Sequence, residues 1–548
     1  MRRGSLQRWL PGALVVAAVL GVAWRLASET THTIAVDQAG YAIGEQKLAY
    51  VFGRTGQFAV VRADGRVAFR GTLGGARFAA DVGQVCAPAE FTSLDQPGTY
   101  FIRLSDGSRS PTFRIAARPH APVLAQVVRA FTTQRCGTAV RTGLPQDHPA
   151  CHLQDGVLWT DPRQHVPTPG GWHDAGDYGK YTVNGAYAAG LLLLAAERLS
   201  AKAGDQADAL RAEAHWEIEW LLTIQAPDGS AYHKVTARKH PGVVPAEGDN
   251  STRYLFPASS TGTGDLAAAL AIAARAYRKE DASLAGRCLA AAERAWQWLA
   301  AHPEPRLFRN PEGVNTGTYG DKGDADERLW AAVELARATG KPAYWEAARA
   351  LAERRRPFFT YAGSWADVAN LAALSLLTDD GLAPADPLRG RLESELVRFA
   401  RKLADRCAQH PLRVVLQPRD YYWGSNGVVL NYAMLLLAGG RLAGDESLTQ
   451  AGRDQVHYLL GRNALGLSFV TGVGENAVRN PHHAPSMLAR DRPAVPGLLV
   501  GGPNAREGRA LSPHPATCYA DVADNWTVNE PAINLNAELA FVLALAGS

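Results

Sequence analysis

The segment best suited to chemistry is GGWHDAGDYGKY, residues 170–181, which sets two carboxylates three positions apart among glycines and aromatic residues. Paired acids can divide the work of general base and water-orienting group, and glycine lets the backbone approach a ligand closely. Asp174 and Asp177 could instead be helix caps for the apolar run that begins near Val183. The surrounding glycines and aromatics, Trp172 among them, favour a ligand-binding and catalytic interpretation.

Several other blocks carry similar mixtures of glycine, polar and aromatic residues. They are GTYGDKGDADERLWAA (317–332), YYWGSNGVVLNYA (421–433), LLGRNALGLSFVTGVG (459–474), NPHHAPS (480–486), LVGGPN (499–504) and NEPAINLNAEL (529–539). With the first segment, these blocks resemble those of glycoside hydrolase family 9, the inverting cellulases, and they occur in the family's order. The resemblance covers residues 120–548.

The resemblance implies roles for three carboxylates. Glycoside cleavage needs one carboxylic acid that protonates the leaving oxygen and one carboxylate that activates water. Asp177 matches the general base, Asp174 matches the acid that helps to hold the water, and Glu530 matches the general acid. For inversion, base and acid should lie roughly 6.5–9.5 Å apart, and a partly apolar setting should raise the pKa of Glu530. The alternative for Glu530 is a helix start, with Asn529 as N-cap and Pro531 in the first turn.

The expected sugar contacts are imidazoles and aromatic rings. His482 and His483 match the family's histidine pair, of which the first member especially grips the sugar. Family members usually place arginine next, whereas this chain has Ala484, so a bidentate donor to sugar hydroxyls is missing. Aromatic residues near the blocks are expected platforms for sugar rings, although each could equally belong to the core. They are Trp172, Trp365, Trp423 and Tyr519.

Two cysteines and two histidines form a candidate zinc site. Cys136, Cys151, His152 and His173 supply two sulfurs and two imidazoles, a set that suits tetrahedral structural zinc. Some family 9 enzymes bind zinc through a similar set, which the resemblance extends to this chain. A Cys136–Cys151 disulfide is the alternative. Pairing among the other four cysteines stays open from sequence. These are Cys86, Cys288, Cys407 and Cys518.

An acidic set matches calcium ligands of several relatives. Asp326 and Glu327 lie in DADERLW, and Asp367 lies in SWADVAN. Hard oxygen donors of this kind suit calcium. A charged helix start at residues 324–327 is the alternative.

After Pro119 the chain alternates between two kinds of helical stretch. One kind is apolar on nearly all faces, such as GAYAAGLLLLAAERL, and the other is charged and amphipathic, such as LRGRLESELVRFARKLADRC. A helix that is apolar all round must be buried, whereas an amphipathic helix covers a layer. The alternation predicts a mainly α fold, an (α/α)6 barrel over residues 120–548, and the family resemblance implies the same fold.

Residues 31–117 consist of short alternating runs separated by turn residues, as in GQFAVVRADG and GTYFIRLSDG. Such alternation predicts a small all-β sandwich. It is similar to the immunoglobulin-like domain that precedes the catalytic domain in one group of family 9 enzymes. We expect it to stabilise the barrel, with carbohydrate binding as the alternative.

The first 30 residues carry Arg2, Arg3 and Arg8 ahead of an apolar run from Leu10 to Trp24. This pattern is typical of an export signal peptide, and the run is short for a spanning helix. A retained membrane anchor is the alternative, because no clear cleavage site follows. The expected location is secreted or periplasmic, or anchored to the membrane and facing outside.

Composition agrees with an exported enzyme of more than one domain. The 548 residues are 47% apolar and 20% charged, and the net charge of +4 is too mild and too evenly spread to indicate nucleic-acid binding. The resemblance to family 9 implies a monomeric endo-β-1,4-glucanase, a cellulase that acts by single-displacement inversion on glucan or cello-oligosaccharide. Because no linker or carbohydrate-binding appendage follows the barrel, soluble or amorphous glucan is the expected substrate. The alternatives are an exo-acting β-glucosidase or glucosaminidase on the same scaffold and a non-catalytic glucan-binding protein.

Overall fold

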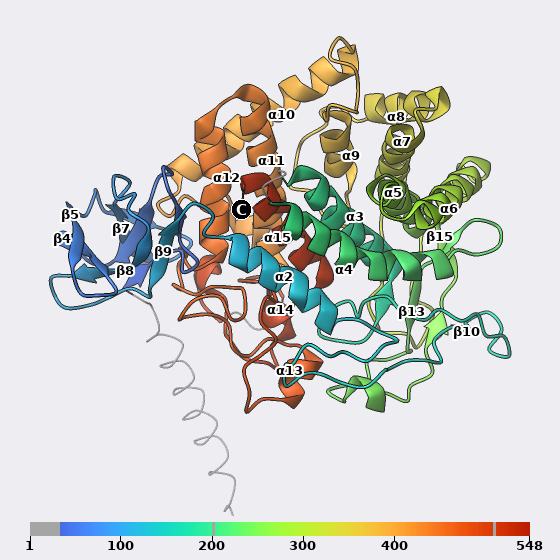
Figure 1. The fold of residues 1–548 in the computed structure, drawn as a ribbon, viewed down its shortest axis with the longest axis horizontal. Coiled ribbons are helices and arrows are strands. Elements are labelled where there is room, and N and C mark those ends of the chain that lie inside the picture. The colour runs from blue at the N-terminus through green and yellow to red at the C-terminus, as the bar shows by residue number, and fades with distance from the viewer. Residues whose placement is uncertain (1–32, 200–202, 508–510, 548) are drawn as a thin grey trace, which may run out of the picture.

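The computed structural model describes residues 33–199, 203–507 and 511–547, which form an amino-terminal β-sandwich and a larger helical domain (Figure 1). The predicted export segment, residues 1–30, lies outside the described residues. In the described part of the chain, no helix combines the length and the apolar character needed to cross a membrane.

The sandwich consists of two sheets with strand orders β1-β3-β7-β6 and β2-β9-β8-β4-β5. Its strands are β1 Ile34–Ala35, β2 Tyr41–Ala42, β3 Leu48–Phe52, β4 Gln57–Arg62, β5 Val67–Thr72, β6 Arg77–Ala79, β7 Gln84–Glu90, β8 Gly98–Leu104 and β9 Phe113–Ala116. Alternate side chains face the space between the sheets: in β8, Tyr100, Ile102 and Leu104 are buried while Thr99 and Arg103 are exposed. The predicted all-β domain is confirmed.

Twelve described helices alternate between an inner and an outer ring. The inner helices are α3 Thr182–Arg198, α5 Ser260–Ala276, α7 Ala325–Thr339, α9 Ala369–Leu376, α11 Ser425–Ala443 and α15 Ile533–Ala546. The outer helices are α2 Ala121–Thr133, α4 Gly204–Thr223, α6 Ala282–Ala301, α8 Pro342–Arg354, α10 Pro387–Gln409 and α12 Glu446–Leu459. The predicted mainly α fold with a helical barrel is confirmed.

Shorter elements lie in the connecting loops. They are strands β10 Val157–Leu158, β11 Lys180–Tyr181, β12 Ala231–Tyr232, β13 Lys234–Thr236, β14 Tyr254–Leu255 and β15 Ala258–Ser259, helices α13 Ala484–Leu488 and α14 Trp526–Asn529, and 3-10 turns η2 Ala246–Gly248, η3 Pro418–Asp420 and η4 Pro515–Thr517.

The two kinds of helix occupy the layers that their sequences predict. Helix α3 is buried along its whole length from Thr182 to Ala196 because nearly every side chain is small or apolar. Helix α10 instead buries one stripe, including Leu388, Leu392 and Leu396, and turns its charged residues to solvent. The family blocks precede inner helices: residues 170–181 lead into α3, 317–324 into α7, 421–424 into α11 and 529–532 into α15. The loops that begin the inner helices therefore meet at one rim.

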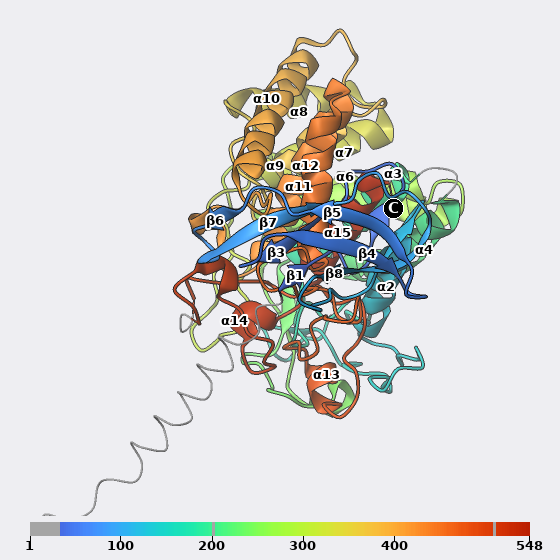
Figure 2. The same ribbon diagram turned by 90° about the vertical axis from the view of Figure 1, so that its left-hand side faces the viewer.

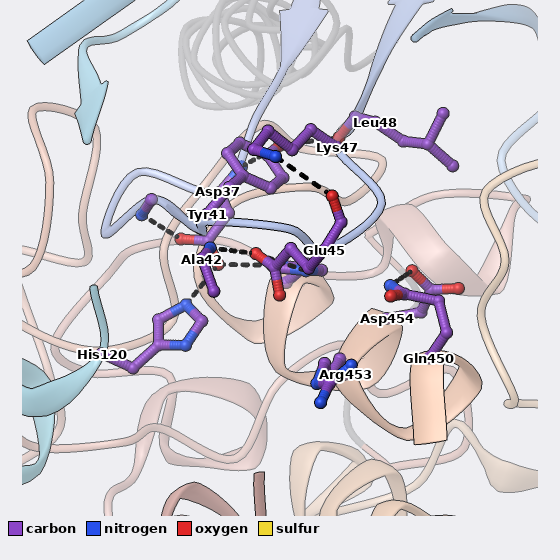
Figure 3. A network of polar contacts seen from close by, with 12 residues as sticks. Asp37, Tyr41, Ala42, Glu45, Lys47, Leu48, His120, Gln450, Arg453 and Asp454 are labelled. Carbon is purple, nitrogen blue, oxygen red and sulfur yellow. Dashed lines mark hydrogen bonds and ion pairs between the residues drawn. The ribbon is translucent and has the colours of Figure 1, made fainter. Parts of the chain in front are cut away.

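The sandwich packs against the barrel beside α12 and α2, as the two ribbon views show (Figures 1 and 2). The side-chain oxygen Oδ2 of Asp37 lies 2.9 Å from His120 Nε2 and 2.7 Å from His457 Nδ1. Figure 3 shows Asp37 of the sandwich facing His120, the residue before α2, while Glu45 accepts from the backbone of Ala42. Burial alone would raise the pKa of Asp37, but the two imidazoles outweigh burial and lower it to about 2. A buried polar network therefore joins the two domains.

Candidate active site

Residues 174–179 form a tight turn ahead of α3. The Asp174 N–H donates to the Gly179 carbonyl at 2.9 Å, and the Gly179 N–H donates to Asp177 Oδ2 at 3.0 Å. Helix α3 begins at Thr182 after Tyr181, whose side chain makes no capping bond. The helix-cap interpretation of Asp174 and Asp177 is therefore wrong.

Three distant segments meet at Gly176. Its carbonyl accepts from the Ala484 N–H at 3.0 Å, and its N–H donates to the Glu530 carboxylate. A Cβ at this position would lie 2.1 Å from the His482 carbonyl oxygen, so only glycine fits. The close approach brings Glu530 next to the two aspartates.

Asp174 is buried and held on both oxygens. Asn184 of α3 donates to Oδ1 at 2.6 Å, and the Tyr319 hydroxyl donates to Oδ2 at 2.5 Å. Burial and then the charge of Asp177 raise the pKa of Asp174 to about 7. The two donors fix the carboxyl plane, which suits a group that orients a water molecule.

Asp177 has the opposite electrostatic setting. Its Oδ2 lies 3.1 Å from His240 Nδ1, and its side chain keeps partial exposure. Burial would raise the pKa of Asp177, but the hydrogen bond and charge of His240, with the Gly179 N–H, lower it below the usual value. Asp177 therefore favours its carboxylate form and remains partly open to water, as a general base requires.

Glu530 is partly exposed and favours its protonated form. Burial first, and then the charges of Asp177 and Asp174, raise the pKa of Glu530 to about 8, although Gly176 and Trp423 donate to its carboxylate. Helix α15 begins at Ile533, well after Asn529.

The side chain of Asn529 does not cap a helix. It is engaged by the Tyr519 hydroxyl and the Asn480 carbonyl. The interpretation of Asn529–Pro531 as a helix start is therefore wrong. The pKa of Asp177 is thus lowered and that of the neighbouring Glu530 is raised, an arrangement that supports general base and general acid catalysis.

The four predicted aromatic platforms have different surroundings. Trp423 is partly exposed beside Glu530, and Trp365 is partly exposed and packs edge-on to Tyr319 with ring centroids 4.7 Å apart. Tyr519 is partly exposed, but its hydroxyl is bound to Asn529. Trp172 is only 1% exposed and donates its indole N–H to a buried glutamate at 3.0 Å. The prediction that Trp172 contacts sugar is therefore wrong.

The two histidines of the pair also differ in their exposure to solvent. His482 is partly exposed beside Gly176, with its Nδ1 2.6 Å from the Ala523 carbonyl. His483 is fully buried, and its ring nitrogens lie 2.9 Å from Ser486 Oγ and 2.8 Å from Gln134 Oε1. The prediction that His483 contacts sugar is wrong, because its ring is buried and both ring nitrogens are engaged in these contacts.

Gln134 links His483 to the turn that carries Asp174. Its amide nitrogen donates to the carbonyls of His173 and Ala175, at 3.3 and 3.0 Å. Thus His483 supports the segment that carries Asp174.

Ala484 does not face an open sugar subsite. Its side chain is 4% exposed and packs with Cys136, Cys151 and Tyr178. The expectation that arginine at this position would reach sugar hydroxyls is therefore wrong, since the side chain would start from a closed cluster.

Sequence reasoning missed Asn184, Tyr319 and His240, the partners of the two aspartates. Asn184 gave a usable signal, because it is a polar residue in an otherwise apolar buried helix. Tyr319 lies in a block already singled out for its acids. His240 lies in a charged loop with no distinguishing pattern.

The four predicted zinc ligands converge, with one ligand atom of each within 4.8 Å of the others. The Cys136 Sγ–His152 Nδ1 distance is 3.7 Å, the Cys151 Sγ–His173 Nε2 distance is 3.8 Å, and the two histidine nitrogens are 3.2 Å apart. Zn–S bonds of about 2.3 Å and Zn–N bonds of about 2.0–2.1 Å place tetrahedral ligand atoms about 3.3–3.8 Å apart. The cluster therefore has the dimensions of a zinc site.

The surroundings of the cluster also suit a metal. His152 Nε2 lies 3.3 Å from Asp249 Oδ2, the carboxylate partner that a metal-bound imidazole commonly has. All six cysteines are free, so the alternative of a Cys136–Cys151 disulfide is wrong, and none of the other four is paired.

A second group, Asp37, His120 and His457, also brings three ligand atoms within 4.8 Å of one another. Its O–N separations of 2.7 and 2.9 Å are ordinary hydrogen-bond lengths and shorter than the edges of a zinc tetrahedron. Hydrogen bonds explain this group fully.

The predicted calcium ligands gather around the start of α7. Both oxygens of Glu327 and both oxygens of Asp265 are buried without a hydrogen-bond partner. Asp326 accepts from the Val368 N–H at 2.9 Å, and Asp367 pairs with Arg355 at 2.6 Å.

Electrostatics of this acidic group resemble those of a cation site. Burial, and then the charge of Asp367, raise the pKa of Asp326 to about 6, and burial followed by the charge of Asp326 raises the pKa of Glu327. Buried carboxylates without donors need a proton or a cation. The alternative of a charged helix start also holds, since α7 begins at Ala325.

Two family models match the chain. The family model for glycosyl hydrolase family 9 matches residues 120–543, and the model for the cellulase N-terminal ig-like domain matches residues 29–109. A cellodextrinase of Butyrivibrio fibrisolvens is 31% identical over 547 residues, which cover 93% of this chain and 99% of that protein.

Two solved structures have the same fold over most of both chains. A metagenome-derived family 9 endoglucanase is 36% identical with a TM-score of 0.86, covering 94% of this chain and 99% of its own. A Zn-binding triple mutant of the family 9 endoglucanase J30 is 34% identical with a TM-score of 0.85, covering 93% of this chain and 100% of its own.

Proposed function

The chain belongs to glycosyl hydrolase family 9 and is a glycoside hydrolase, and we propose that it is an endo-β-1,4-glucanase that acts by direct inversion. The observation that carries this proposal is the meeting of Asp174, Asp177 and Glu530 around Gly176, where the pKa of Asp177 is lowered and that of Glu530 is raised. A metagenome-derived relative with 36% identity is an endoglucanase, which supports a β-1,4-glucan as the substrate.

In this mechanism Asp177 removes a proton from water as the water attacks the anomeric carbon. Glu530 gives its proton to the leaving glycosidic oxygen in the same step, so the bond to that oxygen breaks while the bond to water forms. Asp174, fixed by Asn184 and Tyr319, holds the water in line. The products are a new reducing end of inverted configuration and a free hydroxyl on the leaving chain.

A product profile tests the position of cleavage. Internal cleavage of carboxymethyl cellulose lowers viscosity long before much reducing sugar accumulates, and it yields mixed products from cellohexaose. The second candidate is exo-acting or short-chain activity, which the cellodextrinase relative favours. Release of one product size from one end, with slow loss of viscosity, would replace the first proposal by the second.

We propose that Cys136, Cys151, His152 and His173 hold a structural zinc ion. Their separations match a tetrahedral site, and a Zn-binding variant exists among the similar structures. A closed four-ligand site would supply stability rather than chemistry. Because His173 precedes Asp174, the ion would brace the catalytic turn.

We also propose a calcium site formed by Asp326, Glu327 and Asp367, with Asp265 as an added neighbour. The unpartnered oxygens of Glu327 and Asp265 support a cation there. Calcium would offset the repulsion between buried carboxylates of α5 and α7.

The location and assembly of the chain are proposals as well. The arginines ahead of an apolar amino-terminal run support export to the periplasm or medium, with membrane anchoring as the alternative. We propose a monomer, which size-exclusion chromatography with light scattering checks. Detection of the protein only in the cytosol would overturn the export proposal.

A further inference from the structure

Asp81 lies in the turn between β6 and β7 of the sandwich, and it contacts two loops of the catalytic domain. Its Oδ1 lies 3.0 Å from His410 Nε2, and its Oδ2 accepts from the Tyr421 hydroxyl at 2.8 Å. Its carbonyl accepts from the Ala516 N–H at 3.0 Å. In Figure 2 this end of the sandwich lies beside the loops that precede α14.

The side-chain contacts of Asp81 are well defined. His410 Nδ1 accepts from the Leu412 N–H at 3.1 Å, so Nε2 carries the proton and donates to Asp81. Burial would raise the pKa of Asp81, but the hydrogen bonds from His410 and Tyr421 lower it, so the group is a carboxylate. Asp81 therefore offers an acceptor to each partner.

The first route from Asp81 leads to the general acid through Tyr421. Tyr421 is fully buried, and without Asp81 its hydroxyl would lose this acceptor. Two residues further on, Trp423 donates its indole N–H to Glu530. The position of Tyr421 therefore sets the position of a donor to Glu530.

The second route leads to the same place through Ala516. This residue belongs to η4, and Tyr519 follows two residues after that turn. The Tyr519 hydroxyl donates to Asn529 Oδ1, next to Glu530. Both routes thus begin at Asp81 and end at residues 529–530.

Close packing leaves the turn little room to shift. A Cβ at Gly83 would lie 2.1 Å from the ring of His514, and the Arg77 guanidinium binds the carbonyls of residues 408 and 409. The β6–β7 turn is therefore packed tightly between residues 408–423 and residues 514–519.

We propose that Asp81 of the immunoglobulin-like domain is a positioning residue for the general acid Glu530. This inference rests on the proposed function, in which Glu530 protonates the leaving oxygen. The domain then contributes to the protonation step itself in addition to stability, because it fixes two loops that hold Glu530.

A leaving-group comparison tests this role. Cellopentaose needs proton donation to its leaving sugar, whereas dinitrophenyl β-cellobioside has a leaving group that needs none. Asp81→Ala and Tyr421→Phe should lower kcat/KM for cellopentaose by about 10-fold and leave the activated substrate within about 2-fold. Asp81→Asn should restore most activity, because its amide can accept from His410 and donate to the Tyr421 hydroxyl.

Asp37→Asn is the matched control, since Asp37 is also an interdomain aspartate bound to histidines, on the α2–α12 side (Figure 3). It should lower Tm without changing the ratio of the two rates. Partial unfolding lowers both rates equally, so the ratio isolates positioning from stability. If Asp81→Ala does not fold, Tyr421→Phe carries the test.

Equal losses on both substrates in Asp81→Ala and Tyr421→Phe would overturn the positioning role, and so would unchanged rates. The wild type and Glu530→Gln separate this outcome from failure of the proposed function. If Glu530→Gln loses cellopentaose activity selectively, Glu530 is the acid and only the role of Asp81 is at stake. If Glu530→Gln loses both activities equally, the acid assignment fails, and the role of Asp81 fails with it.

Discussion

Three carboxyl groups of similar intrinsic acidity acquire different protonation from their immediate partners. His240 stabilises the carboxylate of Asp177, whereas burial first, and then the charges of both aspartates, raise the pKa of Glu530 to about 8. Asp174 is fixed from both sides by neutral donors. Base, acid and orienting group are thus distinguished by their neighbours rather than by residue type.

Removal of His240 should shift the acidic limb of the kcat/KM profile to higher pH. Asp177 acts as a carboxylate, and loss of the imidazole leaves burial to raise its pKa. His240→Asn should therefore cost about 10-fold at pH 4 and little near neutral pH. A pH profile on cellopentaose measures the change.

His215→Asn is the control for this prediction, because His215 is also 45% exposed and paired with a carboxylate, Glu219, outside the site. Its profile should match that of the wild type. An unchanged acidic limb in His240→Asn would show that another group sets the charge of Asp177.

Arginine at position 484 should weaken the enzyme. The Ala484 methyl is buried beside Cys136 and Tyr178, so a long charged side chain must displace the cluster, at about 1–3 kcal/mol for overpacking alone. Ala484→Arg should lower Tm and raise KM for cello-oligosaccharides. Ala489→Arg, in the partly exposed residue after α13, should change neither. A lower KM with unchanged Tm would show that the arginine does reach sugar.

The three candidate carboxylates were predictable from sequence because the blocks around them resemble those of glycoside hydrolase family 9. The surroundings of Trp172 and His483 were not predictable, since each lies beside a candidate site residue but is itself buried. His240 and Tyr319 act through contacts made only after folding. The resemblance therefore indicated the candidate catalytic carboxylates but not their supporting partners.

At the scale of elements, the loops before the inner helices carry the candidate catalytic residues, and the two proposed metal sites lie beside these loops. The cysteine–histidine cluster ties residues 136 and 151–152 to His173, next to Asp174. The acidic group lies where Gly264 of α5 approaches Glu327 of α7. Both sites therefore lie next to loops that precede inner helices.

Loss of zinc should loosen the catalytic turn. Purified protein should hold about one zinc ion, and Cys151→Ser should remove it, lower Tm and reduce kcat about 10-fold through misplacement of Asp174. Cys288→Ser, in a buried cysteine of α6 far from the cluster, should keep the metal. Metal analysis with thermal melts checks this, and full activity without zinc would contradict it.

Calcium should stabilise the protein most at neutral pH. The pKa of Asp326 is raised to about 6, so the stability that its protonation gives is present below the unfolded value of about 4 and lost as pH rises through 6. Free calcium at about 100 times its Kd should then add about 2.7 kcal/mol. The added stability should fade near pH 4, where protons replace the ion.

Glu327→Gln separates calcium binding from general salt effects. It should abolish the calcium-dependent rise in Tm and raise Tm in chelator, because a buried uncompensated charge is removed. Sodium chloride at matched ionic strength is the control. An equal calcium effect in Glu327→Gln would remove Glu327 from the site.

The helix layers were predictable for the same reason that they form. Stretches that are apolar on nearly all faces, such as α3 and α11, have no polar side that could face solvent. They were therefore expected to form the inner ring. Helix α7 gave a weaker signal, since charged residues such as Glu334 lie buried within it and are paired with arginines only in the folded barrel. Hydrophobic periodicity therefore predicts burial well for apolar helices. It predicts burial poorly for a helix whose buried charged residues are paired with residues far away in the sequence.

At the scale of the whole molecule, the sandwich and the barrel form one catalytic unit. Among the contacts of the sandwich with the barrel are those of Asp37 on one side and of Asp81 on the other, and the contacts of Asp81 lead toward Glu530. The alternation of its strands predicted the domain, but nothing in its sequence indicated which residue would touch the site. The contacts of Asp81 with the barrel are defined only when the two domains pack together.

The stereochemistry of the first product tests the central claim most directly. Cellopentaose is mixed with enzyme in deuterated buffer, and the anomeric protons of the new reducing ends are followed by NMR before mutarotation. Water activated by Asp177 attacks opposite the leaving group, so the α-anomer should appear first and the β-anomer should grow only later. Early appearance of the β-anomer would require a covalent intermediate and would contradict the assignment of Asp177 as general base.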